Sequence, residues 1–216
     1  MRAGPACKVP VFFVKWYCTD IVDVPTWPCV AVPVRARMTD MTLTIPDFSS
    51  ASVLVAGDVM LDQYWFGGTK RISPEAPVPV VQVRQDDERP GGAAKVAVNL
   101  ASLGSAAQLI GLAGNAQAAD TLERSLAAAD VDVALMRDPT LPTITKLRVL
   151  SRGQQLIRLD REERAQSALS LTAMVAERLP NSSVVVLSDY GKGALRDAPA
   201  LISACRQAKV PVLVDP

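Results

Sequence analysis

The adjacent glycines Gly91 and Gly92 precede a stretch of helical composition, and here the sequence could bind a ligand through its backbone. Glycine lets a ligand approach the main chain closely, and the start of a helix favours oxygen-rich or anionic groups. Lys95 and Asn99 follow at intervals of four residues, which would place them on the helix face of Gly91. The pattern is equally compatible with a glycine turn and a solvated lysine. It matches neither GxGxxG nor GxxxxGK(S/T), the glycine motifs that bind nucleotide phosphates.

A second candidate site follows residues 52–56, an apolar segment typical of a buried strand. Asp58 and Asp62 come after this segment, four residues apart. In open α/β sheets ligands bind beyond the carboxyl ends of the strands, so these carboxylates could bind the hydroxyl groups of a sugar. They could also form turns or caps, which is a common use of aspartate where a strand ends.

A third candidate site follows residues 184–187, the most apolar segment of the chain. Asp189 and Lys192 lie here among glycines. A carboxylate and an ammonium group in such a loop suit a phosphate or a metal-linked site. An ordinary loop between a strand and a helix explains the same residues equally well.

The composition excludes several classes of function. The chain has 216 residues, 49% of them hydrophobic, and contains no histidine. Catalytic triads, Cys-His pairs and HExxH zinc sites are therefore excluded, and acid–base chemistry must come from Asp, Glu, Lys, Cys or Tyr. A net charge of +1 gives no electrostatic signature of nucleic-acid binding, and no apolar run reaches 18 residues, so no membrane span is expected.

The composition changes near residue 46. Residues 1–46 contain six prolines and three of the four cysteines, without a regular hydrophobic period. We expect an irregular extension over residues 1–46 and a folded domain over residues 47–216; Met38 and Met41 suggest that residues 1–37 are absent from the natural product. The cysteines are too widely spaced for a metal site and are interpreted as incidental thiols of a reducing compartment. They are Cys7, Cys18, Cys29 and Cys205.

Strand-like and helix-like segments alternate from Ser52 onward, which predicts an α/β fold with a parallel sheet covered on both faces. Residues 78–83 are β-branched but contain proline, which suits an edge strand or a small lid. The other expected strands are residues 52–56, 108–112, 144–150, 155–159, 184–187 and 210–214, and the expected helices are residues 93–103, 120–129, 169–179 and 198–208.

Taken together, these segments resemble the ribokinase-like (pfkB) carbohydrate kinases, and within them most closely the heptose 7-phosphate kinases of lipopolysaccharide core synthesis. The resemblance extends from about Leu43 to the end of the chain. Residues 72–80 and 142–160 resemble the heptose kinases specifically, whereas the di-glycine stretch is general to the superfamily. The stretches that support it are residues 57–65, 71–80, 88–94, 99–104, 142–149, 154–160 and 187–193.

The resemblance implies a ribokinase-like, doubly wound, mostly parallel sheet with a small β lid formed by residues 64–83 and parts of residues 143–159. Asp62 matches the aspartate that holds a sugar hydroxyl, and Gly91 and Gly92 match the di-glycine that meets the sugar. Asp189 and Lys192 match positions near the substrate and its phosphates.

Lys95 departs from the family, which has asparagine at this position. Lysine only donates hydrogen bonds and brings a charge, whereas asparagine both donates and accepts. Lys95 could meet a sugar phosphate, or it could weaken the binding of hydroxyl groups. We adopt the second possibility as the hypothesis.

The resemblance further implies a cytoplasmic kinase that uses ATP and Mg²⁺ to phosphorylate C1 of D-glycero-β-D-manno-heptose 7-phosphate, and that pairs as a homodimer through its lid. The family's Asn-x-x-Glu stretch and its Gly-Ala-Gly-Asp motif, with the general base, have no match before Pro216. We therefore expect a domain without its C-terminal part, inactive alone, with no catalytic, metal or ATP-binding residue to assign.

Two other interpretations stay open. The chain could be a non-catalytic module that binds a sugar phosphate or dimerises. It could also be a different pfkB sugar kinase, such as a fructokinase or ribokinase, because substrate choice depends on the geometry of the pocket.

Overall fold

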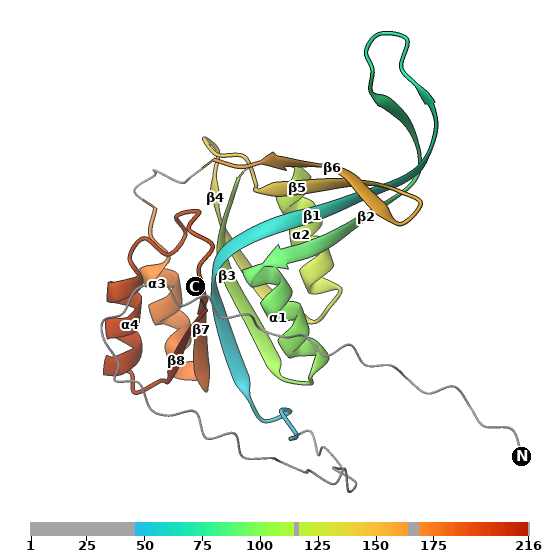
Figure 1. Ribbon diagram of the computed structural model, residues 1–216. Coiled ribbons are helices and arrows are strands. Elements are labelled where there is room, and N and C mark those ends of the chain that lie inside the picture. Colours follow the sequence, from blue (N-terminus) through green and yellow to red (C-terminus); the bar gives the residue numbers. More distant parts are fainter. Residues whose placement is uncertain (1–45, 115–116, 164–168, 216) are drawn as a thin grey trace, which may run out of the picture. The chain divides into compact units, whose positions relative to one another are not determined.

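The computed structural model describes residues 46–114, 117–163 and 169–215 (Figure 1). The expected extension over residues 1–46 lies outside the described residues, apart from Pro46, and so do Cys7, Cys18 and Cys29. Cys205 is described and is a buried free thiol. No helix within the described ranges is long and apolar enough to cross a membrane.

Five strands form a parallel sheet in the order β4-β3-β1-β7-β8. The chain adds β3 and β4 on one side of β1, and then crosses over to add β7 and β8 on the other side. The point where the strand order reverses therefore lies between β1 and β7. The strands are β1 (Ser52–Ile72), β3 (Ala106–Gly114), β4 (Val131–Asp138), β7 (Val184–Ser188) and β8 (Val212–Asp215).

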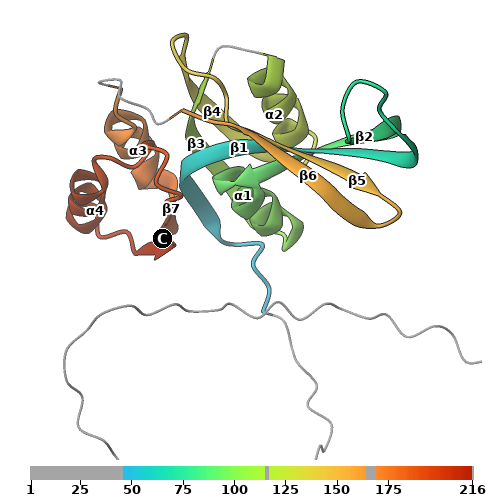
Figure 2. The same cartoon turned by 45° about the horizontal axis from the view of Figure 1, so that its top comes forward.

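Helices cover both faces of this sheet, as the sequence predicts (Figures 1 and 2). Alternate residues of β1 supply the two cores, because successive side chains of a strand point to opposite faces. Val53 and Val55 belong to the core beneath α1 and α2, and Leu54 and Ala56 belong to the core beneath α3 and α4. The helices are α1 (Ala93–Ser102), α2 (Gln117–Ala127), α3 (Thr172–Arg178), the 3₁₀ turn η1 (Leu179–Asn181) and α4 (Ala198–Gln207).

A second, smaller sheet is the lid, in which the second half of β1 lies between β2 (Pro79–Gly92) and β5 (Thr145–Ser151). The β2 strand runs antiparallel to β1, β5 runs parallel to it, and β6 (Gln154–Arg161) is antiparallel to β5. Figure 2 shows the lid extending beyond the parallel sheet. The expected proline-bearing lid strand is confirmed, and it lies at an edge, where proline is tolerated.

The main difference from expectation is that β1 does not end at Ala56. It continues as one strand of 21 residues through both sheets. Gly57 suggests a strand end in the sequence, but its role is close packing, because a Cβ at this position would lie 2.0 Å from the carbonyl oxygen of Ser188. A single strand therefore connects the lid rigidly to the parallel sheet.

Candidate functional site

The carboxylate of Asp58 holds the loop that follows β7. Its Oδ2 accepts hydrogen bonds from the backbone N–H groups of Tyr190 and Lys192 at 2.9 and 3.0 Å, and its Oδ1 accepts one from Ala194 at 3.0 Å. Asp58 is only 2% exposed. The Asp58 carboxylate follows the last β1–β7 pair, Gly57 with Ser188, and it acts as a loop cap, one of the two alternatives that the sequence leaves open.

Gly91 and Gly92 pack so closely against β1 that a side chain at either position would clash with it. Gly92 has a φ of +58°, and a Cβ there would lie 2.4 Å from the carbonyl oxygen of Asp58. A Cβ on Gly91 would lie 2.7 Å from Oδ2 of Asp62 and 2.8 Å from Cγ of Met60. The pair therefore brings bare backbone against the Asp62 carboxylate, as the resemblance implies for a sugar site.

Gly91 and Gly92 belong to the end of β2, and α1 begins only at Ala93. The expected common helix face of Gly91, Lys95 and Asn99 is therefore wrong, because the backbone is still extended at Gly91. Lys95 and Asn99 are exposed on α1.

Asp62 is paired with an arginine that the sequence reasoning misses. Nη1 of Arg148 on β5 donates to Oδ1 of Asp62 at 2.6 Å, and the two side chains are only 20% and 16% exposed. Partial burial of the guanidinium opposes its charge, but the hydrogen bond and the charge of Asp62 outweigh burial, so the pKa of Arg148 is raised. Two arginines contact the Tyr64 ring. The guanidinium carbon of Arg148 lies 5.2 Å from the ring centre, and that of Arg89 lies 5.0 Å from it.

A chain of ion pairs connects the lid with the loop after β7. Nζ of Lys192 donates to Glu162 at 2.8 Å, and Nζ of Lys146 donates to Glu162 at 3.3 Å and to Asp160 at 3.0 Å. The hydrogen bond from Lys192 is the main reason why the pKa of Glu162 is lowered. For Asp160, burial opposes ionisation, but the hydrogen bonds from Lys146 and Arg158 outweigh it and lower the pKa.

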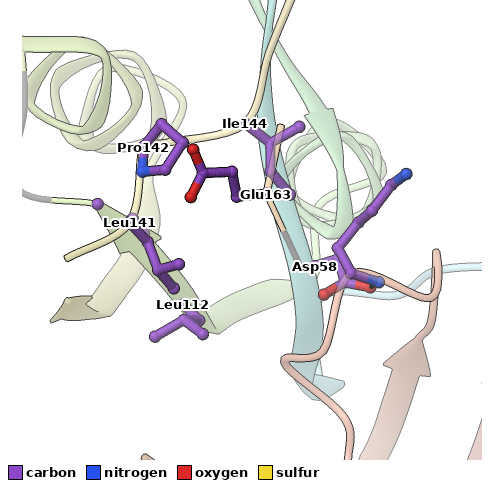
Figure 3. A pocket seen from close by; sticks show the side chains of 9 residues that line it. Asp58, Leu112, Leu141, Pro142, Ile144 and Glu163 are labelled. Atoms are coloured by element: carbon purple, nitrogen blue, oxygen red, sulfur yellow. Dashed lines mark hydrogen bonds between the residues drawn. The ribbon is translucent and has the colours of Figure 1, made fainter. Parts of the chain in front are cut away.

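A small open hollow lies at the carboxyl ends of the core strands (Figure 3). Asp58 and Lys192 line it, together with Leu112 from the end of β3. Figure 3 shows Glu163 between Pro142 and Ile144 at the same hollow. Ligands of open α/β sheets bind at this end of the strands, so the hollow marks the side of the sheet where a ligand would lie.

The structure brings several of the expected site residues together. Asp62 adjoins Gly91, Gly92 adjoins Asp58, and Asp58 in turn holds the backbone of Lys192. Asp189 is half-buried, and its side chain accepts a hydrogen bond from the N–H of the nearby Gly191 at 2.8 Å, while its own backbone N–H donates to the carbonyl oxygen of Asp215 at 2.9 Å. Lys95 lies exposed at the start of α1.

Arg148 and Glu162 are the residues that the sequence reasoning missed. A signal for Arg148 exists, because residues 142–149 are part of the resemblance and the alternation of a strand places every second residue on one face. Glu162 gave no comparable signal, since it lies in a run of five charged residues that indicates only solvated surface.

A model of the pfkB family carbohydrate kinases matches residues 50–216. The chain is 58% identical over 174 residues to the bifunctional protein HldE of Alcanivorax borkumensis, and 57% identical over 178 residues to that of Aeromonas hydrophila. These matches cover 80% and 82% of the chain, and 37% and 38% of the two relatives. The chain thus spans less than half the length of the curated relatives.

Solved structures share the fold at low sequence identity. A carbohydrate kinase from Agrobacterium tumefaciens superposes with a TM-score of 0.61 at 19% identity, covering 76% of this chain and 53% of that one. Arabidopsis thaliana ribokinase, solved with ribose and ATP, gives a TM-score of 0.56 at 18% identity, covering 77% of this chain and 51% of that one. Phosphofructokinase-2 from Escherichia coli, solved with fructose-6-phosphate, gives 0.56 at 22% identity, covering 76% of this chain and 54% of that one. The expected ribokinase-like fold is therefore confirmed.

Proposed function

The chain belongs to the pfkB family of carbohydrate kinases, and on this premise we propose that it forms the sugar-binding part of a kinase for D-glycero-β-D-manno-heptose 7-phosphate. The reaction of the whole enzyme would transfer the γ-phosphate of ATP to the C1 hydroxyl group. The relatives named HldE and the heptose-type residues 72–80 and 142–160 support this choice of substrate.

The observation that supports sugar binding most directly is the contact between Asp62 and the di-glycine. A carboxylate can accept hydrogen bonds from two sugar hydroxyls, and Gly91 places backbone without a side chain directly beside it. The lid strands β1, β2 and β5 hold Asp62 at a position set by the ladder on both sides of β1.

Calorimetric titration of the chain with heptose 7-phosphate tests the proposal. Asp62→Asn should weaken binding about 10-fold or more, because a neutral amide is a poorer acceptor for hydroxyl donors. Asp132→Asn on β4 is the matched control, since Asp132 is exposed and far along the sheet from the lid. Equal affinities for wild type and Asp62→Asn would contradict the proposal.

We assign neither ATP nor Mg²⁺ to particular residues. Across residues 46–114, 117–163 and 169–215, no group of three or more Cys, Asp or Glu side chains could hold a metal ion. We propose that Lys192 lies near the substrate, where its ion pair with Glu162 and the loop held by Asp58 position it. A cytoplasmic location belongs to the same proposal, because the reaction would consume ATP.

A non-catalytic sugar-phosphate-binding module is the second candidate. It is supported by the position of Asp62 beside Gly91 and by its ion pair with Arg148, which are suited to binding a sugar phosphate. A kinase assay on the same preparation distinguishes the two: ADP formation that depends on heptose 7-phosphate favours the kinase, and binding without turnover favours the module.

We also propose pairing of two copies through the apolar face of the lid. Trp65, Ile157 and Leu159 alternate on this face and are 41%, 50% and 51% exposed. Exposed apolar side chains gathered on one sheet face are typical of an interface. Ile157→Asp should convert a dimer to a monomer in sedimentation velocity, whereas a monomeric wild type would exclude the pairing.

A further inference from the structure

The lid face that carries Asp62 also carries arginines. In the strand register Asp62 lies opposite Arg89 of β2, and Tyr64 lies opposite Arg148 of β5. Because every second side chain of a strand points to the same face, Asp62 and Tyr64 share one face of β1 with these partners. The opposite face carries Trp65, which lies opposite Val149 of β5 in the strand register. The charged face is the one that adjoins Gly91 and so the proposed sugar position.

Arg148 uses only part of its hydrogen-bonding capacity. Its Nη1 donates to Asp62, and more weakly to the carbonyl oxygen of Lys146 at 3.5 Å. Among the residues that the structure describes, Nε and Nη2 of Arg148 have no hydrogen-bond partner. A guanidinium binds a carboxylate or phosphate best through two parallel N–H groups, and one such pair remains available here.

Arg89, the other arginine on the Tyr64 ring, differs in this respect. Its Nε donates to Oδ2 of Asp87 at 2.8 Å, its Nη2 lies 2.6 Å from the same oxygen, and its side chain is 61% exposed. Arg148 is 20% exposed, so water screens its charge less. The partly buried guanidinium with spare donors is therefore the stronger anion site of the two.

Because Asp62 is paired with Arg148, the charge of the sugar ligand affects how well it fits the site. Arg148 donates to Oδ1 of Asp62 alone, and a carboxylate accepts several hydrogen bonds, so Asp62 can also accept one from a sugar hydroxyl. If the sugar is neutral, the remaining donors of the partly buried guanidinium gain no partner from the ligand. A sugar phosphate supplies a hydroxyl for Asp62 and an anion for Arg148 in one molecule, so both groups are satisfied at once.

We propose, resting on the proposed function, that Arg148 binds the phosphate group of a phosphorylated sugar and thereby selects phosphorylated over neutral sugars at the Asp62 site. The phosphate would bind through Nε and Nη2, while Nη1 stays paired with Asp62. Arg148 is thus a specificity-determining residue. The Tyr64 ring beneath its guanidinium helps to hold it in place by a cation–π interaction.

The test is a calorimetric comparison of two ligands, D-glycero-D-manno-heptose 7-phosphate and the same heptose without phosphate. The variants are Arg148→Gln and Arg148→Lys, which keeps the charge but lacks the planar pair of donors. The matched control is Arg158→Gln, because Arg158 is the register neighbour of Arg148 on β6, is 51% exposed and is paired with Asp160. Thermal unfolding followed by circular dichroism verifies that each variant is folded.

Arg148→Gln should weaken binding of the phosphorylated heptose about 10- to 100-fold and leave binding of the neutral heptose unchanged or stronger, with Arg148→Lys intermediate. Arg158→Gln should change neither affinity by more than about 3-fold. An equal loss for both ligands would show that Arg148 only orients Asp62, and unchanged affinity for the phosphorylated heptose would show that it does not reach the phosphate. Either result overturns the inference and leaves the proposed function standing.

Fructose 6-phosphate, added as a third ligand, shows whether the proposed substrate can be wrong while the phosphate site at Arg148 is correct. If wild type binds fructose 6-phosphate through Arg148 but does not bind heptose 7-phosphate, the proposed substrate is wrong and the phosphate site is supported. If the chain binds no phosphorylated sugar, both proposals are overturned.

Discussion

The parallel sheet and the lid share the strand β1 but are stabilised in different ways. In the sheet, Leu54 and Val55 of β1 are fully buried between helices on both faces. In the lid, every residue of β6 is exposed, and charged pairs such as Asp62 with Arg148 lie beside buried side chains such as Val149. Apolar burial stabilises a fold irrespective of ligand, whereas partly exposed ion pairs contribute little to stability. The sheet is therefore the scaffold, and the lid is the part whose interactions a ligand can exchange.

The largest effect should come from removing a buried side chain of the scaffold. Leu54→Ala should lower the free energy of unfolding by about 2–5 kcal/mol, because it leaves a cavity between β1 and its helices. Leu159→Ala in the lid is the matched change and should cost less than about 1 kcal/mol, since Leu159 is 51% exposed. Urea unfolding measures both, and equal losses would break the distinction between scaffold and lid.

The two aspartates of β1 give the next contrast. Asp58→Asn should destabilise the fold by about 1–3 kcal/mol, because three backbone N–H groups of the loop after β7 depend on its two oxygens. Asp62→Asn should have a smaller effect on unfolding but should weaken sugar binding. Unfolding and calorimetric titration of both variants provide the comparison. A large loss of stability in Asp62→Asn would place Asp62 in the scaffold.

Lys95 lies where the lid passes into the scaffold, at the first turn of α1. If it weakens sugar binding, Lys95→Asn should raise the affinity for heptose 7-phosphate about 3- to 10-fold, because asparagine adds an acceptor for a hydroxyl. The stability should stay the same, since Lys95 is exposed. A lower affinity in the calorimeter would instead assign Lys95 to the phosphate.

The smallest effect should come from the ion pairs between the lid and the loop after β7. The pKa of Glu162 is lowered in the folded chain, chiefly by Lys192, so this carboxylate stabilises the fold above its ordinary pKa of 4.5 and loses that contribution as the pH falls through the lowered value. Glu162→Gln should therefore cost less than about 1 kcal/mol at pH 7, and nothing at a pH below the lowered pKa. Urea unfolding at several pH values checks this, and a difference that persisted in acid would contradict it.

Much of the scaffold could be predicted because its strands are continuous apolar runs and its helices end at recognisable residues. Gly104 is an example, since it follows α1 with a φ of +92°. The strand β4 was not predicted, because residues 131–138 combine apolar side chains with Asp132 and Arg137 and so form no continuous apolar run. Charged residues are tolerated there because β4 is an edge strand that pairs only with β3 in the described sheet.

The segments that form the lid were predicted, but the continuous strand that joins the lid to the parallel sheet and the contacts within the lid were not. In the local sequence, Gly57 and Asp58 indicate a turn. The contacts that explain them lie about 130 residues away: Gly57 packs against Ser188, and Asp58 accepts hydrogen bonds from the loop that begins with Asp189. The pairing of Asp62 with Arg148 likewise joins residues 86 positions apart. Periodicity reports local structure, and it gives no information on which distant residue meets a given carboxylate.

Amide hydrogen exchange of the chain with and without heptose 7-phosphate tests the central claim most directly. The ligand should slow exchange in the second half of β1, around Asp62 and Tyr64, in β5 around Arg148, and at Gly91 and Gly92. Exchange in β3 and β4 should stay the same, because the scaffold is already formed without ligand. Uniform slowing across both sheets, or no change in the lid, would contradict a lid that binds sugar phosphate on a preformed scaffold.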